Sequence, residues 1–303
     1  MQKSRARSWC RWFLLLACIV STAHAQVAVR DDAGRLVELR APARRIVSLA
    51  PNITELLYAA GAGNRIVGAV EYSDYPEAAK RLPRVGSGAG LDLEAIVARH
   101  PDLVIAWQTG NPSWQVEQLR GLGLTVFVIE PRRMEEIADL LERFGRLAGT
   151  QATADAAAAE YRRHLAQLHA RYAARPPVPV FYQILDASLL TVSDRHLISD
   201  VIRLCGGENV FADLPGITPR VDIESVLQRN PEVILASGDA RLWSGWRERW
   251  QAWPGLAAVR DHGLFFIPPD FIERSSPRIL DGAENVCRAL EQVRARQKSS
   301  GGR

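Results

Sequence analysis

Four acidic side chains form two matching pairs in this chain. Asp92 and Glu94 recur 130 positions later as Asp222 and Glu224. An Asp placed just before a helical run is a typical N-cap, and the helix dipole favours a carboxylate in the first turn. Each pair therefore predicts the start of a stable helix. The duplication also puts one carboxylate at the same surface point of two equivalent units, which suits a partner with two-fold symmetry.

Acidic and basic side chains are plentiful, but the sequence lacks the motifs that organise them for catalysis. It contains no Gly-x-Ser-x-Gly, no His-Glu-x-x-His and no phosphate loop. The glycine-rich stretch 86–90 is not followed by the Lys of a Walker motif. We therefore do not expect an enzyme, and we expect no catalytic cofactor.

Histidines could ligate a metal, but their positions do not favour a metal site. His164 and His169 are five positions apart on one predicted helix, which places them on different faces. His100, His196 and His262 are far from both in the sequence. Because no cluster has metal-ligand spacing, each His is interpreted as a surface or structural residue, and no metal is predicted.

The first 25 residues have the pattern of a secretory signal peptide. Four basic residues precede the apolar run 12–20, and Ala23-His24-Ala25 is a small-x-small cleavage signal. We expect export and cleavage after Ala25. The alternative is a lipoprotein processing site at Leu15-Leu16-Ala17-Cys18, which would leave a lipid anchor on Cys18.

Export changes how the charge and the cysteines are interpreted. The chain has 38 basic and 34 acidic side chains, and the four basic residues before position 12 are lost on cleavage. The remaining 34 of each sign remove the electrostatic case for binding nucleic acid. Only Cys205 and Cys287 would remain in an oxidising compartment, where a disulfide is favoured, although two buried free thiols are the alternative.

Two α/β units are needed to position these residues. Short β-branched runs alternate with helical stretches, first between residues 45 and 147 and again after Pro179, which is typical of mostly parallel sheets. Segment 91–106 recurs as segment 221–236, and each copy reads as a capped helix, a Pro turn and a buried strand. The repeat makes the two units structural equivalents. The predicted strands are 46–49, 66–70, 103–106, 126–129, 180–183, 233–236 and 265–267.

One long helix is predicted between the two units. The Ala-rich segment 150–175 carries Tyr161, Leu165, Leu168 and Tyr172 at spacings of four, three and four. At 1.5 Å per residue it would extend for roughly 35–40 Å, which favours a strut across both lobes over the last helix of the first lobe. The predicted organisation is a signal peptide 1–25, an N-terminal lobe 26–149, a linking helix 150–175, a C-terminal lobe 176–297 and a disordered tail 298–303. The tryptophans at 243, 246, 250 and 253 have the spacing of a helix stripe in a core.

Three segments carry a resemblance to a known family. They are Arg-Ile-Val-Ser-Leu-Ala-Pro-Asn-Ile-Thr-Glu-Leu at 45–56, Tyr-Ser-Asp-Tyr-Pro at 72–76 and Asp-Phe-Ile-Glu-Arg-Ser-Ser-Pro-Arg at 270–278. With segments 101–107 and 204–211, they resemble the corrinoid branch of the helical-backbone (class III) periplasmic solute-binding proteins. The similarity covers nearly the whole chain after the signal peptide.

The resemblance implies a fold, a ligand and partners. The expected fold is two Rossmann-like lobes with mostly parallel sheets, joined by one long backbone helix. The expected function is to capture a corrinoid (vitamin B12, cobalamin) in the periplasm and to deliver it to an ABC importer permease dimer with its ATPase. We expect a monomer that does not bind nucleic acid.

The resemblance also implies site residues. Tyr72 corresponds to a residue that contacts the corrin and Trp107 to a cleft aromatic. A loop of the C-terminal lobe, which would line the opposite side, comprises Asp270, Phe271, Ile272, Glu273 and Arg274. Glu94 and Glu224 correspond to paired carboxylates that dock onto arginines of the permease, and Cys205 and Cys287 correspond to the disulfide of the family.

Three positions depart from the family pattern. Gly88 and Thr218 stand where a cleft Trp is expected, and Leu190 stands where a Phe is expected. With fewer aromatic walls, a ferric siderophore or haem is the alternative ligand. Arg274 and Arg278 would pair with an anionic siderophore, and Tyr72 would ligate haem iron.

Overall fold

The computed structural model describes residues 27–87, 90–172, 174–184, 189–238 and 245–300. The predicted signal peptide, with the alternative anchor at Cys18, lies outside the described residues, as do Gly88 and Trp243. Within these ranges, no helix has both the length and the apolar character needed to cross a bilayer.

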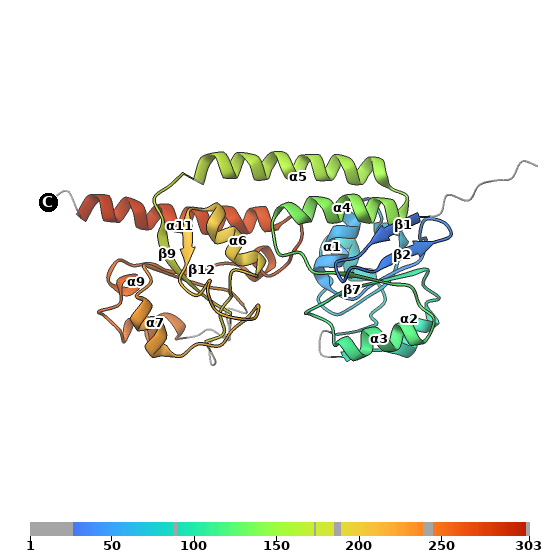
Figure 1. Ribbon diagram of the computed structural model, residues 1–303, viewed down its shortest axis with the longest axis horizontal. Coiled ribbons are helices and arrows are strands. Elements are labelled where there is room, and N and C mark those ends of the chain that lie inside the picture. Colours follow the sequence, from blue (N-terminus) through green and yellow to red (C-terminus); the bar gives the residue numbers. More distant parts are fainter. Residues whose placement is uncertain (1–26, 88–89, 173, 185–188, 239–244, 301–303) are drawn as a thin grey trace, which may run out of the picture.

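Two lobes lie side by side, each built around a four-stranded sheet in which all strands are parallel (Figure 1). The first sheet has the order β4-β3-β7-β8 and the second the order β10-β9-β11-β12. In both sheets the second strand in sequence pairs with the first at one edge. The strand bounds are β3 Ile46–Ser48, β4 Ile66–Ala69, β7 Leu103–Trp107, β8 Val126–Ile129, β9 Val178–Gln183, β10 Gly207–Asn209, β11 Val233–Ala236 and β12 Leu264–Phe266. The predicted α/β class with two equivalent lobes is confirmed.

Helices cover both faces of the N-terminal sheet. Side chains alternate across a strand, so Val104 packs among residues of α2 (Leu93–Ala98) and α3 (Ser113–Gly121). Its neighbour Ile105 packs on the other face, among residues of α1 (Pro51–Ala59) and α4 (Glu135–Ala148). The smaller elements of this lobe are the hairpins β1 (Val27–Arg30) with β2 (Leu36–Leu39) and β5 (Gly86–Ser87) with β6 (Gly90–Leu91), and the 3-10 turns η1 (Gly63–Arg65) and η2 (Glu77–Arg81).

The C-terminal lobe repeats this layering. Residues of α6 (Leu197–Leu204) and α11 (Ile279–Ser300) pack on one face of its sheet with Val180 and Leu235. The other face packs against helices α7 (Ile223–Arg229), α8 (Trp246–Gln251) and α9 (Ala257–Arg260), and α10 (Pro269–Ile272) follows β12. The predicted disulfide is present: Cys205, directly after α6, is bonded to Cys287 in α11.

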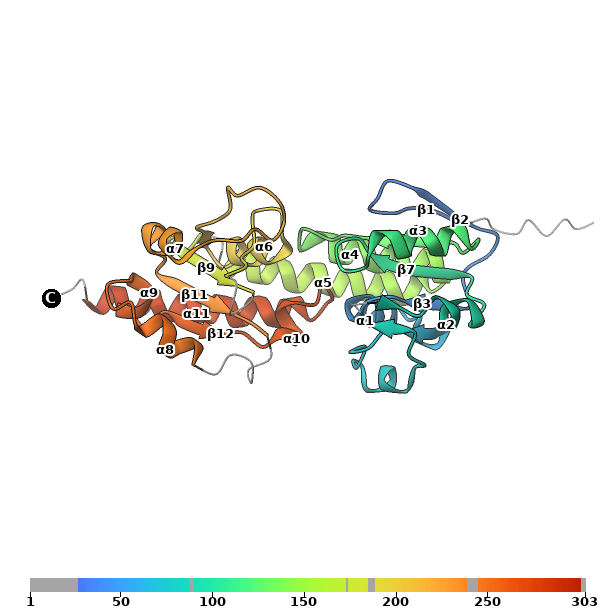
Figure 2. The same ribbon diagram turned by 90° about the horizontal axis from the view of Figure 1, so that it is seen from below.

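Helix α5 (Gln151–Tyr172) lies across both lobes, as Figures 1 and 2 show. It has 22 residues, so its length is about 33 Å. Its buried stripe includes the predicted Tyr161, Leu165, Leu168 and Tyr172 and is extended by Ala154 and Ala158. A Cβ at Gly145 of α4 would lie 2.4 Å from the Cβ of Ala154, so glycine at this position allows the two helices to approach closely.

The structure differs from the sequence-based expectations at a few elements. Strand β10 and the β1–β2 hairpin were not predicted. Strand β10 is only three residues long and starts at a glycine, so its composition does not indicate a strand. Helix α11 continues to Ser300, so the first part of the expected disordered tail is helical. Trp246 and Trp250 are buried in the core as expected, and both indole N–H groups donate to Oε1 of Gln183. Trp253 lies beyond the end of α8 and is 41% exposed.

Candidate ligand-binding cleft

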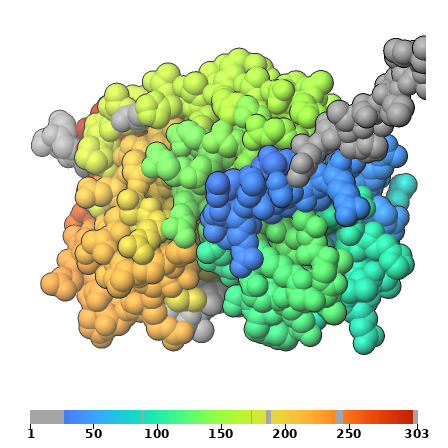
Figure 3. All heavy atoms as spheres, turned by 45° about the vertical axis from the view of Figure 1, so that its right-hand side comes forward, coloured from blue at the N-terminus to red at the C-terminus, as the bar shows by residue number. Residues whose placement is uncertain are grey.

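A cavity lies between the carboxyl ends of the two sheets. Its N-terminal wall contains residues that follow β7 and β8, and its C-terminal wall contains residues that follow β12 and precede α6. In Figure 3 the two lobes, coloured blue to green and yellow to orange, meet along a boundary beneath α5. Ligands of open α/β sheets bind at this edge of the strands. The lining residues are Trp107, Thr109, Glu130, Pro131, Arg132, Arg195, His196, Leu197, Ile217, Ile272, Glu273 and Ser275.

Trp107, the last residue of β7, is the aromatic wall of this cavity. Asn111 fixes the backbone around it: the Trp107 N–H donates to Oδ1 of Asn111 at 2.8 Å, and the Asn111 side-chain amide donates to the Leu49 carbonyl at 2.9 Å. A Cβ at Gly110 would lie 2.0 Å from the Trp107 ring, so only glycine leaves room for it. The structure thus places Trp107 where sequence reasoning expected a cleft aromatic.

Glu130, directly after β8, is a cavity residue that sequence reasoning missed. The backbone N–H of Thr109 donates to its carboxylate at 3.0 Å, and the Thr109 hydroxyl also donates to it. Burial raises the pKa of Glu130 above its ordinary value, and the bonds from Thr109 only partly oppose this. Its position after a buried strand was the signal that could have identified it.

The C-terminal wall contains part of the predicted loop. Ile272 and Glu273 line the cavity together with Ser275. Glu273 is anchored by Ser237, whose hydroxyl donates to its carboxylate at 2.6 Å. That hydroxyl is also bonded to the Tyr182 hydroxyl, and burial raises the pKa of Tyr182 well above its usual range.

His196 is a second cavity residue that was not predicted as a site residue. It is the N-cap of α6, and its Nδ1 accepts a hydrogen bond from the Ile198 N–H at 3.1 Å. Burial lowers the pKa of His196 to about 4, so the ring is neutral at pH 7. With Nδ1 as an acceptor, the proton is on Nε2, which is a donor. His is not a preferred N-cap type, so sequence offered no signal for this role.

The charges around the cavity balance. Glu130 and Glu273 are acidic, Arg132 and Arg195 are basic, and His196 is neutral at pH 7. Such a lining suits a ligand without net charge whose edges both donate and accept hydrogen bonds. It does not provide the excess of cations that a strongly anionic ligand would require.

Four predicted ligand residues lie outside the cavity lining: Tyr72, Asp270, Phe271 and Arg274. Tyr72 is 76% exposed after β4 and adopts a left-handed φ of 64°, which is uncommon for a bulky side chain. Asp270 is exposed and lies 3.1 Å from Arg274, whose side chain is 13% exposed and also pairs with Glu55 and Asp74. The Arg278 guanidinium lies 5.4 Å from the ring centroid of Phe271. The roles of these residues stay predictions.

The two acidic repeats have the same local geometry. Asp92 accepts a hydrogen bond from the Ala95 N–H at 2.9 Å, and Asp222 accepts one from the Ser225 N–H at 2.8 Å. The residues before the repeated Pro, His100 and Asn230, both have left-handed φ values, of 46° and 44°. The two copies therefore share the cap hydrogen bond and the left-handed residue before the repeated Pro.

The glutamates of these repeats remain available to a partner. Glu94 and Glu224 are exposed, and neither has a hydrogen bond or ion pair with the rest of the described chain. Their helices, α2 and α7, lie on the side of the molecule away from α5, one on each lobe (Figure 1).

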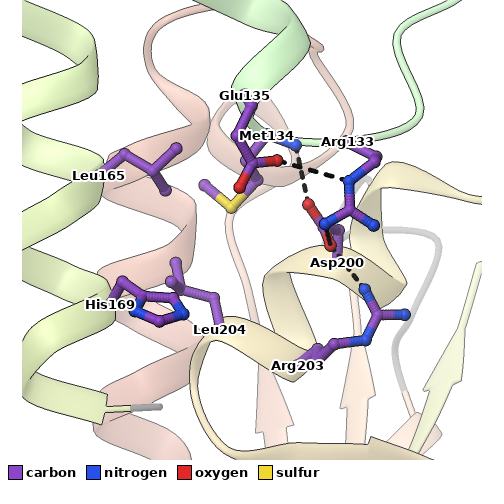
Figure 4. Close-up of a pocket in the computed structure, with 8 residues that line it drawn as sticks. All are labelled: Arg133, Met134, Glu135, Leu165, His169, Asp200, Arg203 and Leu204. Carbon is purple, nitrogen blue, oxygen red and sulfur yellow. Dashed lines mark hydrogen bonds and ion pairs between the residues drawn. The ribbon is translucent and has the colours of Figure 1, made fainter.

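A second pocket lies where α4, α5 and α6 meet (Figure 4). Its main feature is Asp200 of α6, which accepts hydrogen bonds from the Met134 N–H at 2.8 Å and from Arg203 at 2.6 Å. The Met134 N–H belongs to the start of α4, so the C-terminal lobe supplies a carboxylate to a helix N-terminus of the other lobe. This hydrogen bond joins the two lobes beside α5. Within the described residues no group of His, Cys, Asp and Glu could hold a metal ion.

Known proteins share both sequence similarity and this architecture with the chain. A sequence model of the family described as periplasmic binding protein matches residues 46–270. The chain is 39% identical over 251 residues to a vitamin B12-binding protein of Vibrio cholerae, with 82% of this chain and 90% of that protein covered. The crystal structure of a periplasmic vitamin B12-binding protein of Vibrio cholerae has a TM-score of 0.77, with 38% identity and 84% and 98% of the two chains covered. A periplasmic haem-binding protein with two haems has a TM-score of 0.74 at 23% identity, over 82% and 98%, and shares the fold.

Proposed function

The chain belongs to the periplasmic binding protein family, and from this premise we propose that it captures a corrinoid of the vitamin B12 type between its lobes and delivers it to an ABC importer. The family consists of solute-binding proteins, so the role is binding and not catalysis. The similarity to vitamin B12-binding proteins over most of both chains is the observation that carries the ligand assignment.

The chemistry of the cavity supports this ligand. A corrin is a large, mostly apolar ring edged with amides, so a flat aromatic wall such as Trp107 suits its face. Amide N–H groups can donate to the carboxylates of Glu130 and Glu273, and amide oxygens can accept from His196. The balanced lining distinguishes this site from one built for a ferric siderophore or for the propionates of haem.

Delivery requires a docking surface and a compartment. Glu94 and Glu224 are the proposed contacts to arginines of the two permease subunits, because they are exposed, matched and on the side away from α5. We place the protein in the periplasm as a monomer, after cleavage at Ala25, and the ATPase acts through the permease. We also propose the lobe boundaries given above, with an N-terminal lobe 26–149, a linking helix 150–175 and a C-terminal lobe 176–297.

A visible spectrum tests the ligand. Purified protein incubated with cyanocobalamin and then desalted should retain corrin absorbance, and Trp107→Ala should retain much less. Trp253→Ala is the matched control, because Trp253 is outside the cavity lining. Loss of all colour from the wild type on desalting would refute the corrinoid, and retention of haem in a parallel sample would reassign the ligand.

A further inference from the structure

One buried carboxylate of the N-terminal lobe is bound entirely by the C-terminal lobe. Glu55 lies in α1, and its side chain is 2% exposed. It accepts hydrogen bonds from Arg274 at 2.9 Å, from the Ser276 hydroxyl at 2.6 Å and from Arg278 at 3.0 and 2.6 Å. All three donors come from one segment more than 200 residues later in the chain.

Arg278 and Arg274 reinforce this contact from both lobes. The Arg278 guanidinium binds Glu55 through two nitrogens and lies 4.0 Å from the ring centroid of Tyr75 in the N-terminal lobe. Arg274 also donates to Asp74 at 2.7 Å. Burial alone would raise the pKa of Asp74, but the bond and charge of Arg274 outweigh it and lower the pKa.

Such a cluster is better suited to fixing a geometry than to adding stability. Removing a buried charge pair from water costs about as much as its attraction returns, so its main effect is to select one arrangement of the groups. Here the arrangement is the position of segment 270–278 relative to α1. The same segment supplies Ile272, Glu273 and Ser275 to the cavity.

We propose that Glu55 is a positioning residue for the ligand site, which holds the C-terminal wall of the cavity against the N-terminal lobe before the ligand arrives. The inference rests on the proposed function, since it assigns Glu55 a role in the same site. Glu55 acts through Arg274, Ser276 and Arg278, and it does not line the cavity. Ligand binding then pays no cost for ordering this wall, which favours a slow dissociation rate.

Glu55→Gln is the direct test, with Arg278→Lys as a second variant that keeps the charge but loses the two-nitrogen contact. Spin labels at Gln118→Cys in α3 and Gln228→Cys in α7, both exposed, report the distance between the lobes. We expect a broader distance distribution in the ligand-free protein and about tenfold faster dissociation of cyanocobalamin, the size typical of positions that act without touching the ligand.

The matched control is Arg294→Lys. Arg294 is also buried, but it donates to Pro176, Cys205 and Gly206 within the C-terminal lobe. It should lower the melting temperature without widening the distance distribution or speeding dissociation. If Glu55→Gln does not fold, Arg278→Lys must show both a broader distance distribution and faster cyanocobalamin dissociation, although each change should be smaller.

Two results would overturn the proposal: an unchanged distance distribution and dissociation rate in the folded Glu55 and Arg278 variants, or the same two changes in Arg294→Lys. If the wild type does not bind cyanocobalamin, the proposed function is refuted. The distance distribution of the ligand-free protein still tests whether Glu55 fixes the lobes, so the two failures can be distinguished.

Discussion

Side chains from both lobes, among them Trp107 and Glu273, line one cavity at the cleft. Trp107 and Glu273 were predicted through family resemblance, and the structure puts both in the cavity lining. Glu130 was missed although it follows a buried strand, the position where α/β proteins place ligands. The pairing of Glu55 with Arg274 and Arg278 could not be predicted, because it depends on how two lobes meet across more than 200 residues.

Tyr72 combines an exposed ring with an unfavourable backbone angle, and such strain is often retained where a side chain serves a ligand. Asn tolerates the left-handed region, so Tyr72→Asn should raise the free energy of unfolding by about 1 kcal/mol. Loss of the ring should weaken cyanocobalamin binding roughly tenfold. Urea denaturation and calorimetric titration measure the two quantities.

The control for Tyr72 is His262→Asn. His262 is exposed and has a left-handed φ of 56°, and it does not line the cavity. This variant should leave ligand affinity unchanged. If Tyr72→Asn also leaves affinity unchanged, Tyr72 is an ordinary loop residue.

At the scale of elements, the sequence predicted best where the signal is local. The central strands and α5 were predicted to within a few residues, because β-branched runs and a 3.6-residue apolar stripe each depend only on neighbouring positions. Strand β10 was missed because an edge strand that begins at Gly207 is defined by its pairing with β9 and not by its composition. The helix cap at His196 was missed because His is not a residue type expected at an N-cap.

The cap of α6 makes a pH-dependent contribution to stability. The pKa of His196 is lowered to about 4 in the folded protein against an ordinary value near 6.5, so the unfolded chain takes up the proton first as the pH falls. Stability from this group is therefore complete above pH 6.5 and is lost between about pH 6.5 and 4. The wild type should lose about 2 kcal/mol more than His196→Asn between pH 7 and 4.5.

Asn is a good N-cap without a proton to titrate, so His196→Asn separates capping from titration. The pKa of Glu130 is raised, which gives the opposite dependence on pH, but this contribution is present in both proteins and cancels in the difference. Urea denaturation at pH 7, 5.5 and 4.5 gives the comparison. Parallel pH profiles for the two proteins would contradict the role assigned to His196.

At the scale of the whole molecule, the internal repeat produces two matched acidic surfaces on one side. Glu94→Arg with Glu224→Arg should leave the free energy of unfolding and cyanocobalamin affinity nearly unchanged, because Asp92 and Asp222 make the caps. Corrinoid uptake should be abolished in cells in which this variant replaces the wild-type chain, since four units of charge change at a charge-complementary interface.

A charge-matched control uses the opposite side of the protein. Asp155→Arg with Glu160→Arg makes the same change of charge on the exposed face of α5. Uptake should be normal in this control. Uptake that survives reversal of Glu94 and Glu224 would remove the docking role from both.

The position of α5 in the chain also has a consequence for biosynthesis. Every described element of the N-terminal sheet precedes α5 and every element of the C-terminal sheet follows it, so the polypeptide crosses between the lobes once. During chain emergence the first sheet can therefore be completed from its own residues while the second is still unmade. Cys287 lies in α11, which follows every strand of both sheets, so the disulfide can form only after the strands of the C-terminal sheet have been synthesised.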